Sequence, residues 1–475
     1  MRFARPGSIA SAVLSLLLFA PLAVVTAEND IEDALSGFDE PGADDNLEDT
    51  LSGFDDGELP VEDTESARWL SGENWRITGD TGVSAAWNYA HQRPGPGETD
   101  WRGLSRLRAR LRPELRLDLG NDWDARVRVN GFYDFAYLIN GRSGYTNQVL
   151  RHYESELEFQ DTYLRGSLGT NLDIKLGRQI VVWGKSDNLR VVDVLNPLDR
   201  RQPGMTDIEN LRLPVTMSRL DYFTGDWRVT ALALHEVRFD KLPVVGSDFY
   251  PYSNPPPEED DIHDGGSNTE YALALSAVMP GWDLSFHLAR LFDEETHLAV
   301  IDDGAELVHA RIDMLGAATN IVFADWLLKV ESAYFDGLRY SAAPGKDFAR
   351  TDLLLGVDYN GFDNTTLTLE SALRHIHSYD RRLELGPVPY QRNRLETAFR
   401  YSADFLNDRW NAIIVATRFG EALNEGGITR IQLGYELRQA LELTGGLVLY
   451  HGRVQWPFDS IADNDRVFLE LKYSF

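Results

Sequence analysis

The sequence predicts an all-β protein: a transmembrane antiparallel β-barrel of about 18 strands (roughly 16 to 18), with an inward-folded loop and a disordered acidic N-terminal arm. Three observations support this prediction. The chain opens on an export signal, it has no apolar run long enough for a membrane-spanning helix, and its body alternates polar and apolar residues in many short segments. Two-residue alternation is the period of a strand whose two faces meet different surroundings.

Residues 1–27 have the features of a secretory signal peptide. Arg2 and Arg5 precede an apolar run, and small residues suited to signal peptidase end at Ala27. We expect cleavage after Ala27; the alternative is an uncleaved membrane anchor. No later segment reaches the roughly 18 apolar residues of a membrane-spanning helix, so a helical membrane protein is not expected.

Residues 28–68 are a separate and strongly acidic region. They hold sixteen Asp and Glu residues, and Arg68 is the only basic residue among them. A segment of such charge buries too little apolar surface to offset the entropy lost on ordering, so we expect a disordered periplasmic arm. Residues 69–475 then form the barrel.

The arm contains the phrase Leu-Ser-Gly-Phe-Asp twice, within residues 31–56. The apolar residues of each copy recur at i, i+4 and i+7, the spacing of a helix that binds in a groove. We hypothesise that both copies dock one periplasmic partner. A solvated spacer that arose by duplication explains the repeat equally well. The proposed docking residues are Leu35, Phe38, Leu51 and Phe54.

Short turns followed by tryptophan divide the barrel region. Gly, Asn and Asp supply tight turns, and tryptophan is favoured at the membrane–water boundary. Short turns on the periplasmic side and long loops outside are the barrel pattern. The tryptophans are Trp123, Trp227, Trp282, Trp326 and Trp410. The long connections are residues 91–102, 139–152, 184–214, 238–268, 293–308, 337–350 and 377–390.

Eighteen alternating runs lie between these connections, an even number that places both barrel ends on the periplasmic side. The last run ends on Phe475, with Tyr473 two residues before it. This ending resembles the signal that the bacterial barrel-assembly machinery recognises, so we expect the chain in the outer membrane, in contact with its lipid; a soluble edge strand is the alternative. The predicted strands are 75–89, 103–118, 122–137, 153–168, 172–183, 215–224, 227–237, 269–279, 282–292, 309–321, 325–336, 351–359, 364–376, 391–402, 409–419, 428–438, 442–452 and 466–475.

The second predicted strand carries arginine at nearly every other position. With Leu107, Leu111 and Leu117 against lipid, the arginines face a water-filled lumen, and the third and fourth strands continue this charged face. Such groups can orient a permeant solute, or they can form a salt-bridged lining without specificity. The predicted lumen-lining residues are Arg106, Arg108, Arg110, Arg112, Arg116, Arg126, Arg128, Glu154, Glu156, Glu158 and Arg178.

The fifth predicted strand and the loop after it depart most from the regular pattern of strands and polar loops. Regular alternation turns Arg178 toward lipid, so we predict a β-bulge at Gly177 that returns Arg178 to the lumen. Residues 184–214 combine many charges with the apolar run from Val191 to Leu195, and we expect this loop to fold inward as a constriction or plug. Its charged residues are Lys185, Asp187, Arg190, Asp193, Asp199, Arg200 and Arg201.

Four motifs resemble an uncharacterised proteobacterial outer-membrane family, domain of unknown function thirteen-oh-two. They are Gly177-Arg-Gln179, Trp183-Gly184, Asp193-Val-Leu-Asn-Pro197 and Leu213-Pro214. Members look like companions of inner-membrane exporters of the resistance-nodulation-division type and of periplasmic lipid-carrier-like proteins. The resemblance implies movement of lipids or other hydrophobic molecules, and it brings no established site residues.

The leading hypothesis for function is therefore a conduit or station in lipid or hydrophobic trafficking, working with a periplasmic or inner-membrane exporter. The alternative is a substrate-selective porin for small charged solutes. An outer-membrane enzyme is less expected, because no nucleophile elbow or His-Glu-x-x-His motif occurs, and His375 and His377 lack a third metal ligand. No cofactor is implied. A net charge of -29 does not suit nucleic-acid binding.

Overall fold

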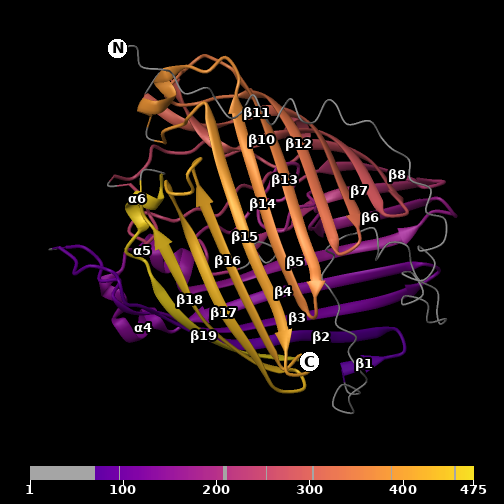
Figure 1. The fold of residues 1–475 in the computed structure, drawn as a ribbon, viewed down its shortest axis with the longest axis horizontal. Coiled ribbons are helices and arrows are strands. Elements are labelled where there is room, and N and C mark those ends of the chain that lie inside the picture. Colours follow the sequence, from indigo (N-terminus) through magenta and orange to yellow (C-terminus); the bar gives the residue numbers. More distant parts are fainter. Residues whose placement is uncertain are drawn as a thin grey trace, which may run out of the picture. The chain divides into compact units, whose positions relative to one another are not determined.

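The computed structural model describes residues 70–475, apart from residues 96, 207–210, 253, 302, 303, 387, 454 and 455. The expected signal peptide, the acidic arm and the duplicated docking motif lie outside the described residues. What is described is one closed antiparallel sheet with long connections at one end (Figure 1).

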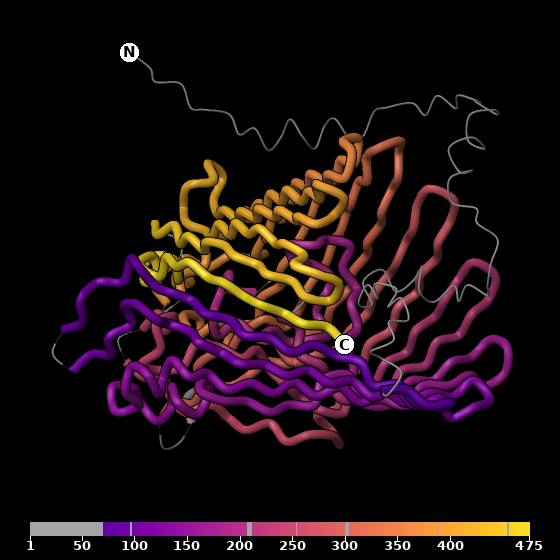
Figure 2. Tube along the Cα trace, turned by 90° about the horizontal axis from the view of Figure 1, so that it is seen from below, coloured from indigo at the N-terminus to yellow at the C-terminus, as the bar shows by residue number. Residues whose placement is uncertain are grey.

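Eighteen strands, β2 to β19, follow one another around the barrel, and β19 closes on β2. Figure 2 shows these two strands side by side. Closure leaves no sheet edge along the junction of first and last strand, as a wall in lipid requires. The predicted antiparallel barrel of 18 strands is confirmed. A short strand, β1 (Ser71–Gly72), pairs only with the start of β2.

The strands that make the wall are β2 (Trp75–Asn88), β3 (Gly103–Gly120), β4 (Trp123–Asp134), β5 (Ser155–Ser167), β6 (Leu172–Gln179), β7 (Val215–Thr224), β8 (Trp227–Leu234), β9 (Glu270–Met279), β10 (Trp282–Ile301), β11 (Gly304–Phe323), β12 (Trp326–Leu338), β13 (Phe348–Phe362), β14 (Thr365–Ile376), β15 (Asn393–Phe405), β16 (Trp410–Phe419), β17 (Gly426–Arg438), β18 (Leu441–His451) and β19 (Arg466–Ser474).

Short helices occupy the connections. They are α4 (Ala136–Asn140), η2 (Arg142–Gly144), α5 (Asn147–Val149), η3 (Leu150–Glu154), η5 (Gly266–Asn268), η6 (Arg381–Leu385) and α6 (Phe458–Ile461). Within the described part of the chain, none of the helices has the length and apolar character to cross a membrane.

The short turns before tryptophan occur as predicted. The five tryptophans are the first residues of β4, β8, β10, β12 and β16. Before β4, Asn121 and Asp122 have φ angles of 55° and 62°. Asn and Asp tolerate this left-handed conformation better than other non-glycine residues, which explains their place in the turn.

One predicted loop, residues 293–308, is mostly strand. Beyond a register shift between Phe292 and Thr296, β10 and β11 continue to pair up to Ile301 and Gly304. The loop prediction is wrong because a hairpin that extends past the membrane has water on both faces. It needs no apolar alternation, so its polar residues look like loop in the sequence.

The wall is shortest on the side of β6 to β9. β6 and β8 have eight residues each, whereas β10 and β11 have twenty each. Residues 180–214 connect β6 to β7, and residues 235–269 connect β8 to β9. Two isolated bridges, Leu198 with Arg212 and Asp199 with Lys241, hold these connections together.

Candidate functional site

The lumen has one side lined with ion pairs, which we call the charged wall and which comprises β19 and β2 to β5. Its arginines lie at alternating positions of β3 and reach across to neighbouring strands. Arg110 Nη2 lies 2.9 Å from Glu470 of β19, and Arg112 Nε lies 2.8 Å from Asp80 of β2. These cross-strand pairs fix the register between the strands that carry them.

Glu114 of β3 is the most crowded group of the charged wall. It is 3% exposed, and its carboxylate lies 2.6 Å from Arg116, 2.8 Å from Arg126 and 2.6 Å from Arg128. One buried carboxylate thus stabilises three guanidinium groups that would otherwise repel one another.

Of the remaining predicted lumen residues of β3 and β5, Arg108 contacts β4 and the others contact the long loops. Arg106 donates to Gln202, and Arg108 stacks 3.8 Å above the ring of Phe132. Glu156 lies 2.9 Å from Arg201, and Glu158 lies 2.8 Å from Lys241. The charged face of the strands therefore continues into the connections.

Glu154 does not share a strand with Glu156 and Glu158, so that part of the prediction is wrong. The chain makes a π-helical turn, η3, and β5 begins only at Ser155. Glu154 accepts from the Tyr133 hydroxyl at 3.1 Å and from Arg142 at 2.9 Å. The turn breaks the alternation that the sequence suggests.

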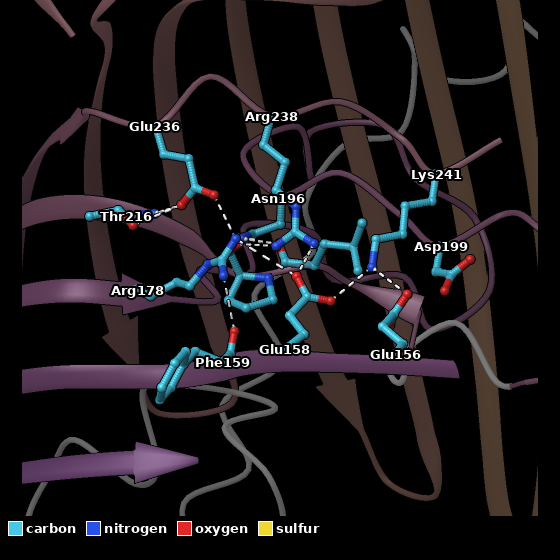
Figure 3. Close-up of polar contacts among 12 residues, drawn as sticks. Glu156, Glu158, Phe159, Arg178, Asn196, Asp199, Thr216, Glu236, Arg238 and Lys241 are labelled. Atoms are coloured by element: carbon cyan, nitrogen blue, oxygen red, sulfur yellow. Dashed lines mark hydrogen bonds and ion pairs between the residues drawn. The ribbon is translucent and has the colours of Figure 1, made fainter. Parts of the chain in front are cut away.

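The predicted β-bulge at Gly177 is also wrong. β6 pairs with β5 and β7 through Gly177 and Arg178 without a register shift. Gly177 has φ of 128°, and a Cβ there would lie 2.4 Å from the Thr162 carbonyl oxygen. Glycine is required for this close backbone approach. Arg178 shares the outward face of Leu176, and its guanidinium reaches past the strand end to Glu236, 2.5 Å away (Figure 3).

Residues 184–214, the inward loop, cross the lumen. Lys185 Nζ lies 2.9 Å from Asp283 at the short-turn end of β10. On the other side of the barrel, Gln202 accepts from Arg106 of β3, and the hydroxyl of Tyr450 in β18 donates to the Pro203 carbonyl at 2.5 Å. The loop therefore extends between opposite walls and narrows the space between them.

Two buried glutamates, Glu331 of β12 and Glu370 of β14, tether the inward loop; each is 0% exposed. Glu331 accepts the backbone N–H groups of Lys185 and Ser186 at 2.6 and 2.8 Å, and that of Val192 at 3.1 Å. Glu370 accepts from the backbone of residues 187 and 188 at 3.0 and 3.1 Å, and from the Ser186 hydroxyl at 2.7 Å. Charge-assisted bonds of this kind are about twice as strong as neutral ones.

Lys329 of β12 neutralises this acidic group. It is 3% exposed, it contacts Asp187 of the inward loop, and its Nζ lies 2.8 Å from Asp358 and 3.6 Å from Glu370. Lys329, Glu331 and Glu370 are not among the site residues predicted from the sequence. Their signal is a charge on the buried face of a strand: Lys329 and Glu331 precede Ala333 on one face of β12, and Glu370 precedes Ala372 on one face of β14.

Most predicted charges of the inward loop pair within the loop or with the adjoining connection. Asp193, 3% exposed, lies 3.1 Å from Arg190 and 3.0 Å from Arg212. Arg200 lies 3.1 Å from Asp240, and Arg201 lies 2.5 Å from Asp199. Burial raises the pKa of Asp199, but the hydrogen bonds and charge of Arg201 outweigh burial and hold that pKa below its usual value.

The side of the lumen made by β7 to β15, the apolar wall, packs against the apolar run of the inward loop. Val192 of the loop, Leu234 of β8 and Leu354 of β13 are each 0% exposed in one continuous cluster. The loop thus buries its hydrocarbon against this wall, and its polar residues 185–188 bind buried charges of the same wall. Its later residues reach the charged wall, where Gln202 contacts Arg106 and Arg201 contacts Glu156.

His375 and His377 do not converge on a third ligand. His375 Nδ1 lies 2.6 Å from Asn393 Oδ1, and His377 Nε2 lies 2.7 Å from Thr351 Oγ1. Among the described residues, no cluster of three or more His, Cys, Asp or Glu side chains could hold a metal ion.

Comparison with known proteins gives a family and a fold. The family model described as protein of unknown function (DUF1302) matches residues 97–475, which confirms the resemblance of the motifs. OccAB2 of Acinetobacter baumannii is 12% identical with a TM-score of 0.50, covering 85% of this chain and 98% of that one. A BenF-like porin from Pseudomonas fluorescens Pf-5 is 9% identical with a TM-score of 0.50, again covering 85% and 98%. These likenesses show an outer-membrane barrel fold. No curated protein matches the chain.

Proposed function

Because the chain belongs to the family of proteins of unknown function DUF1302 and folds as an outer-membrane barrel, we propose that it is a selective passage for small amphipathic solutes. The observation that carries the proposal is the inward loop, which crosses the lumen and is tethered by Glu331 and Glu370. A loop fixed across a barrel makes a constriction whose lining selects what passes.

The two walls support an amphipathic cargo. Arg110 and Glu470 of the charged wall keep 28% and 32% of their side chains exposed, whereas the apolar wall and the loop's apolar run are closely packed. A solute with a charged group and a hydrocarbon body can contact both kinds of surface at the constriction. The proposal thus combines the selective porin and the hydrophobic cargo of the sequence hypotheses.

We also propose that the passage works with an inner-membrane exporter and a periplasmic partner, which requires no enzymatic step in the barrel. The basis is the family resemblance together with the duplicated motif of residues 31–56. Capture of one periplasmic protein by the intact chain, lost when Phe38 and Phe54 are changed to Ala, is the expected result. Retention of that protein by the double variant would count against docking at the motif.

Single-channel conductance of the purified protein in planar bilayers tests the passage. In the double variant Glu331→Gln and Glu370→Gln, each amide offers one acceptor oxygen where the carboxylate offered two, so the loop loses its tether. We expect conductance to rise severalfold over wild type, on the order of 2- to 5-fold, as the loop leaves the lumen.

Asp347→Asn is the matched control, since Asp347 pairs with Arg339 in an outer connection where both side chains are more than half exposed. It should leave conductance unchanged. If the tether variant, folded as judged by heat-dependent gel mobility, conducts like wild type, the loop is not the constriction and the proposal fails.

A further inference from the structure

The barrel wall is interrupted between β5 and β6. β6 pairs with β5 only from Thr162 opposite Arg178 to Ser167 opposite Asp173, whereas β5 begins at Ser155. Residues 155–161 are covered by β4 on one side, and within the described part of the chain no strand or bridge pairs with them on the other. An open strand edge is costly in lipid, so this one needs an explanation.

β5 is also bent at this place. Val127 lies opposite Thr162 and Val129 lies opposite Phe159, so two residues of β5 face one residue of β4. Such a β-bulge bends the strand that carries the extra residue. β5 therefore changes direction at the point where its ladder with β6 ends.

Side chains close the interruption, in place of a backbone ladder (Figure 3). Arg178 donates to the Phe159 carbonyl at 3.1 Å, which satisfies one edge group of β5. Lys241 Nζ lies 2.8 Å from Glu158 and 3.2 Å from Glu156. We call this group the ion-pair seam; its members are Glu156, Glu158, Arg178, Glu236, Arg238 and Lys241.

Strand lengths indicate that the interruption lies at membrane depth. A membrane-spanning strand needs about 9 to 11 residues, and β6 and β8 have only eight each, so their wall ends below the outer lipid boundary. Beside the open edge, Leu157 and Phe159 of β5 expose 81% and 57% of their surface. Large apolar side chains with such exposure are suited to contact with lipid.

On the lumen side, the interruption leads to the start of the apolar wall. Met217 of β7 and Leu232 and Leu234 of β8 belong to the apolar cluster and are at most 4% exposed. Apolar residues thus lie on both sides of the seam, exposed on β5 and packed with the inward loop on the lumen side, with Arg178, Arg238 and Lys241 between.

We propose that the interruption is a lateral gate through which an anionic amphiphile with a hydrocarbon chain moves between the lumen and the outer leaflet. The cations of the seam bind the anionic group, and Leu157 and Phe159 contact the chain as it enters lipid. Ion pairs can separate one by one, whereas a strand ladder must open cooperatively, which is why a seam suits a gate. The inference rests on the proposed passage and adds its exit and its cargo class.

A cross-link over the seam tests the gate, since the chain has no cysteine. Asp161→Cys with Ile180→Cys places the cross-link where the ladder ends, between β5 and the residue after β6, which are neighbours there: Ile180 N lies 3.3 Å from Asp161 Oδ1. Ser167→Cys with Asp173→Cys, opposite each other in the regular ladder, is the matched control. The full chain in liposomes is assayed with two probes: succinate, by swelling, and nitrobenzoxadiazole-labelled dodecanoate delivered from albumin, by its fluorescence on entering the membrane.

Oxidation of the Asp161→Cys, Ile180→Cys protein should lower protein-dependent dodecanoate transfer by about fivefold or more, with recovery on reduction and little change for succinate. The control pair should change neither rate. Glu158→Gln, which weakens the seam without a cross-link, should raise dodecanoate transfer.

Equal transfer by the oxidised and reduced protein overturns the gate, as does a Glu158→Gln protein that transfers no faster than wild type. A wild type that passes succinate but transfers no dodecanoate also overturns the gate and leaves the proposed passage standing. A wild type that passes neither probe overturns both.

Discussion

The charged wall and the apolar wall are held together by different forces. On the charged wall, Glu114 contacts three arginines, and the pair of Arg110 and Glu470 keeps about a third of its surface open to water. On the apolar wall, Leu234 and Leu354 are fully buried beneath the inward loop.

This difference explains why the inward loop packs against the apolar wall and why water remains beside the charged wall. The loop uses its apolar run and two buried glutamates to attach to the apolar side, and it meets the charged side through polar contacts such as that of Gln202 with Arg106. Solvated groups therefore concentrate between the loop and the charged wall, and a permeating solute meets the arginines there.

The largest expected effect is on the charged wall. Glu114→Ala leaves three guanidinium groups without their shared carboxylate, and we expect it to lower the free energy of unfolding by about 4 kcal/mol. Urea unfolding in lipid vesicles, followed by tryptophan fluorescence, measures the change. Glu73→Gln, at an exposed site before β2, is the control. If Glu114→Ala costs within 1 kcal/mol of the control, water screens the repulsion between the three arginines without help from the carboxylate.

A somewhat smaller loss of unfolding free energy is expected for a substitution on the apolar wall. Leu234→Ala opens a cavity at a fully buried position and should cost about 3 kcal/mol of unfolding free energy in the same assay. Leu385→Ala, at a position 86% exposed in η6, should cost little. If the two leucines give equal effects, the apolar cluster does not support the loop.

The ion pairs of the inward loop and the apolar wall should also differ in their response to pH. The pKa of Asp199 is lowered in the folded protein, so its contribution to stability is present above its unfolded pKa and is lost as pH falls through the folded value. The difference in unfolding free energy between wild type and Asp199→Asn should stay constant from neutral pH to about pH 5 and shrink below about pH 4. The same titration of Leu234→Ala should show a constant difference. If the difference in unfolding free energy between wild type and Asp199→Asn grows as pH falls, the pKa of Asp199 is not lowered in the folded protein.

The smallest effect is expected where the charged wall meets water. Glu470→Gln removes a pair whose side chains are about one third exposed, and it should cost less than about 1 kcal/mol at low salt. Because salt screens exposed pairs, this cost should fall further between about 0.05 M and 1 M salt. A large cost that does not depend on salt would show that Arg110 and Glu470 act as a buried pair.

The strands and the orientation of most of their faces follow from the sequence. The arginines of β3 pair across to β2 and β19, and Val467, Leu469 and Leu471 of β19 expose 40–52% of their surface on the opposite face. The predictions are wrong at three places: the strand position of Glu154, the β-bulge at Gly177 and the loop after Phe292. A helical turn, a close backbone approach and a hairpin outside the membrane do not follow the lipid–water alternation.

Local sequence patterns suffice to specify the closed barrel, since two-residue alternation, tight turns and boundary tryptophans are properties that lipid and water act on strand by strand. Which charges act together depends instead on how the folded chain packs. Glu331 meets Lys185 across 146 positions, and Arg178 meets Glu236 across 58. Such contacts depend on how a long loop packs inside a barrel and on where the pairing of two strands ends. No local sequence pattern predicts either.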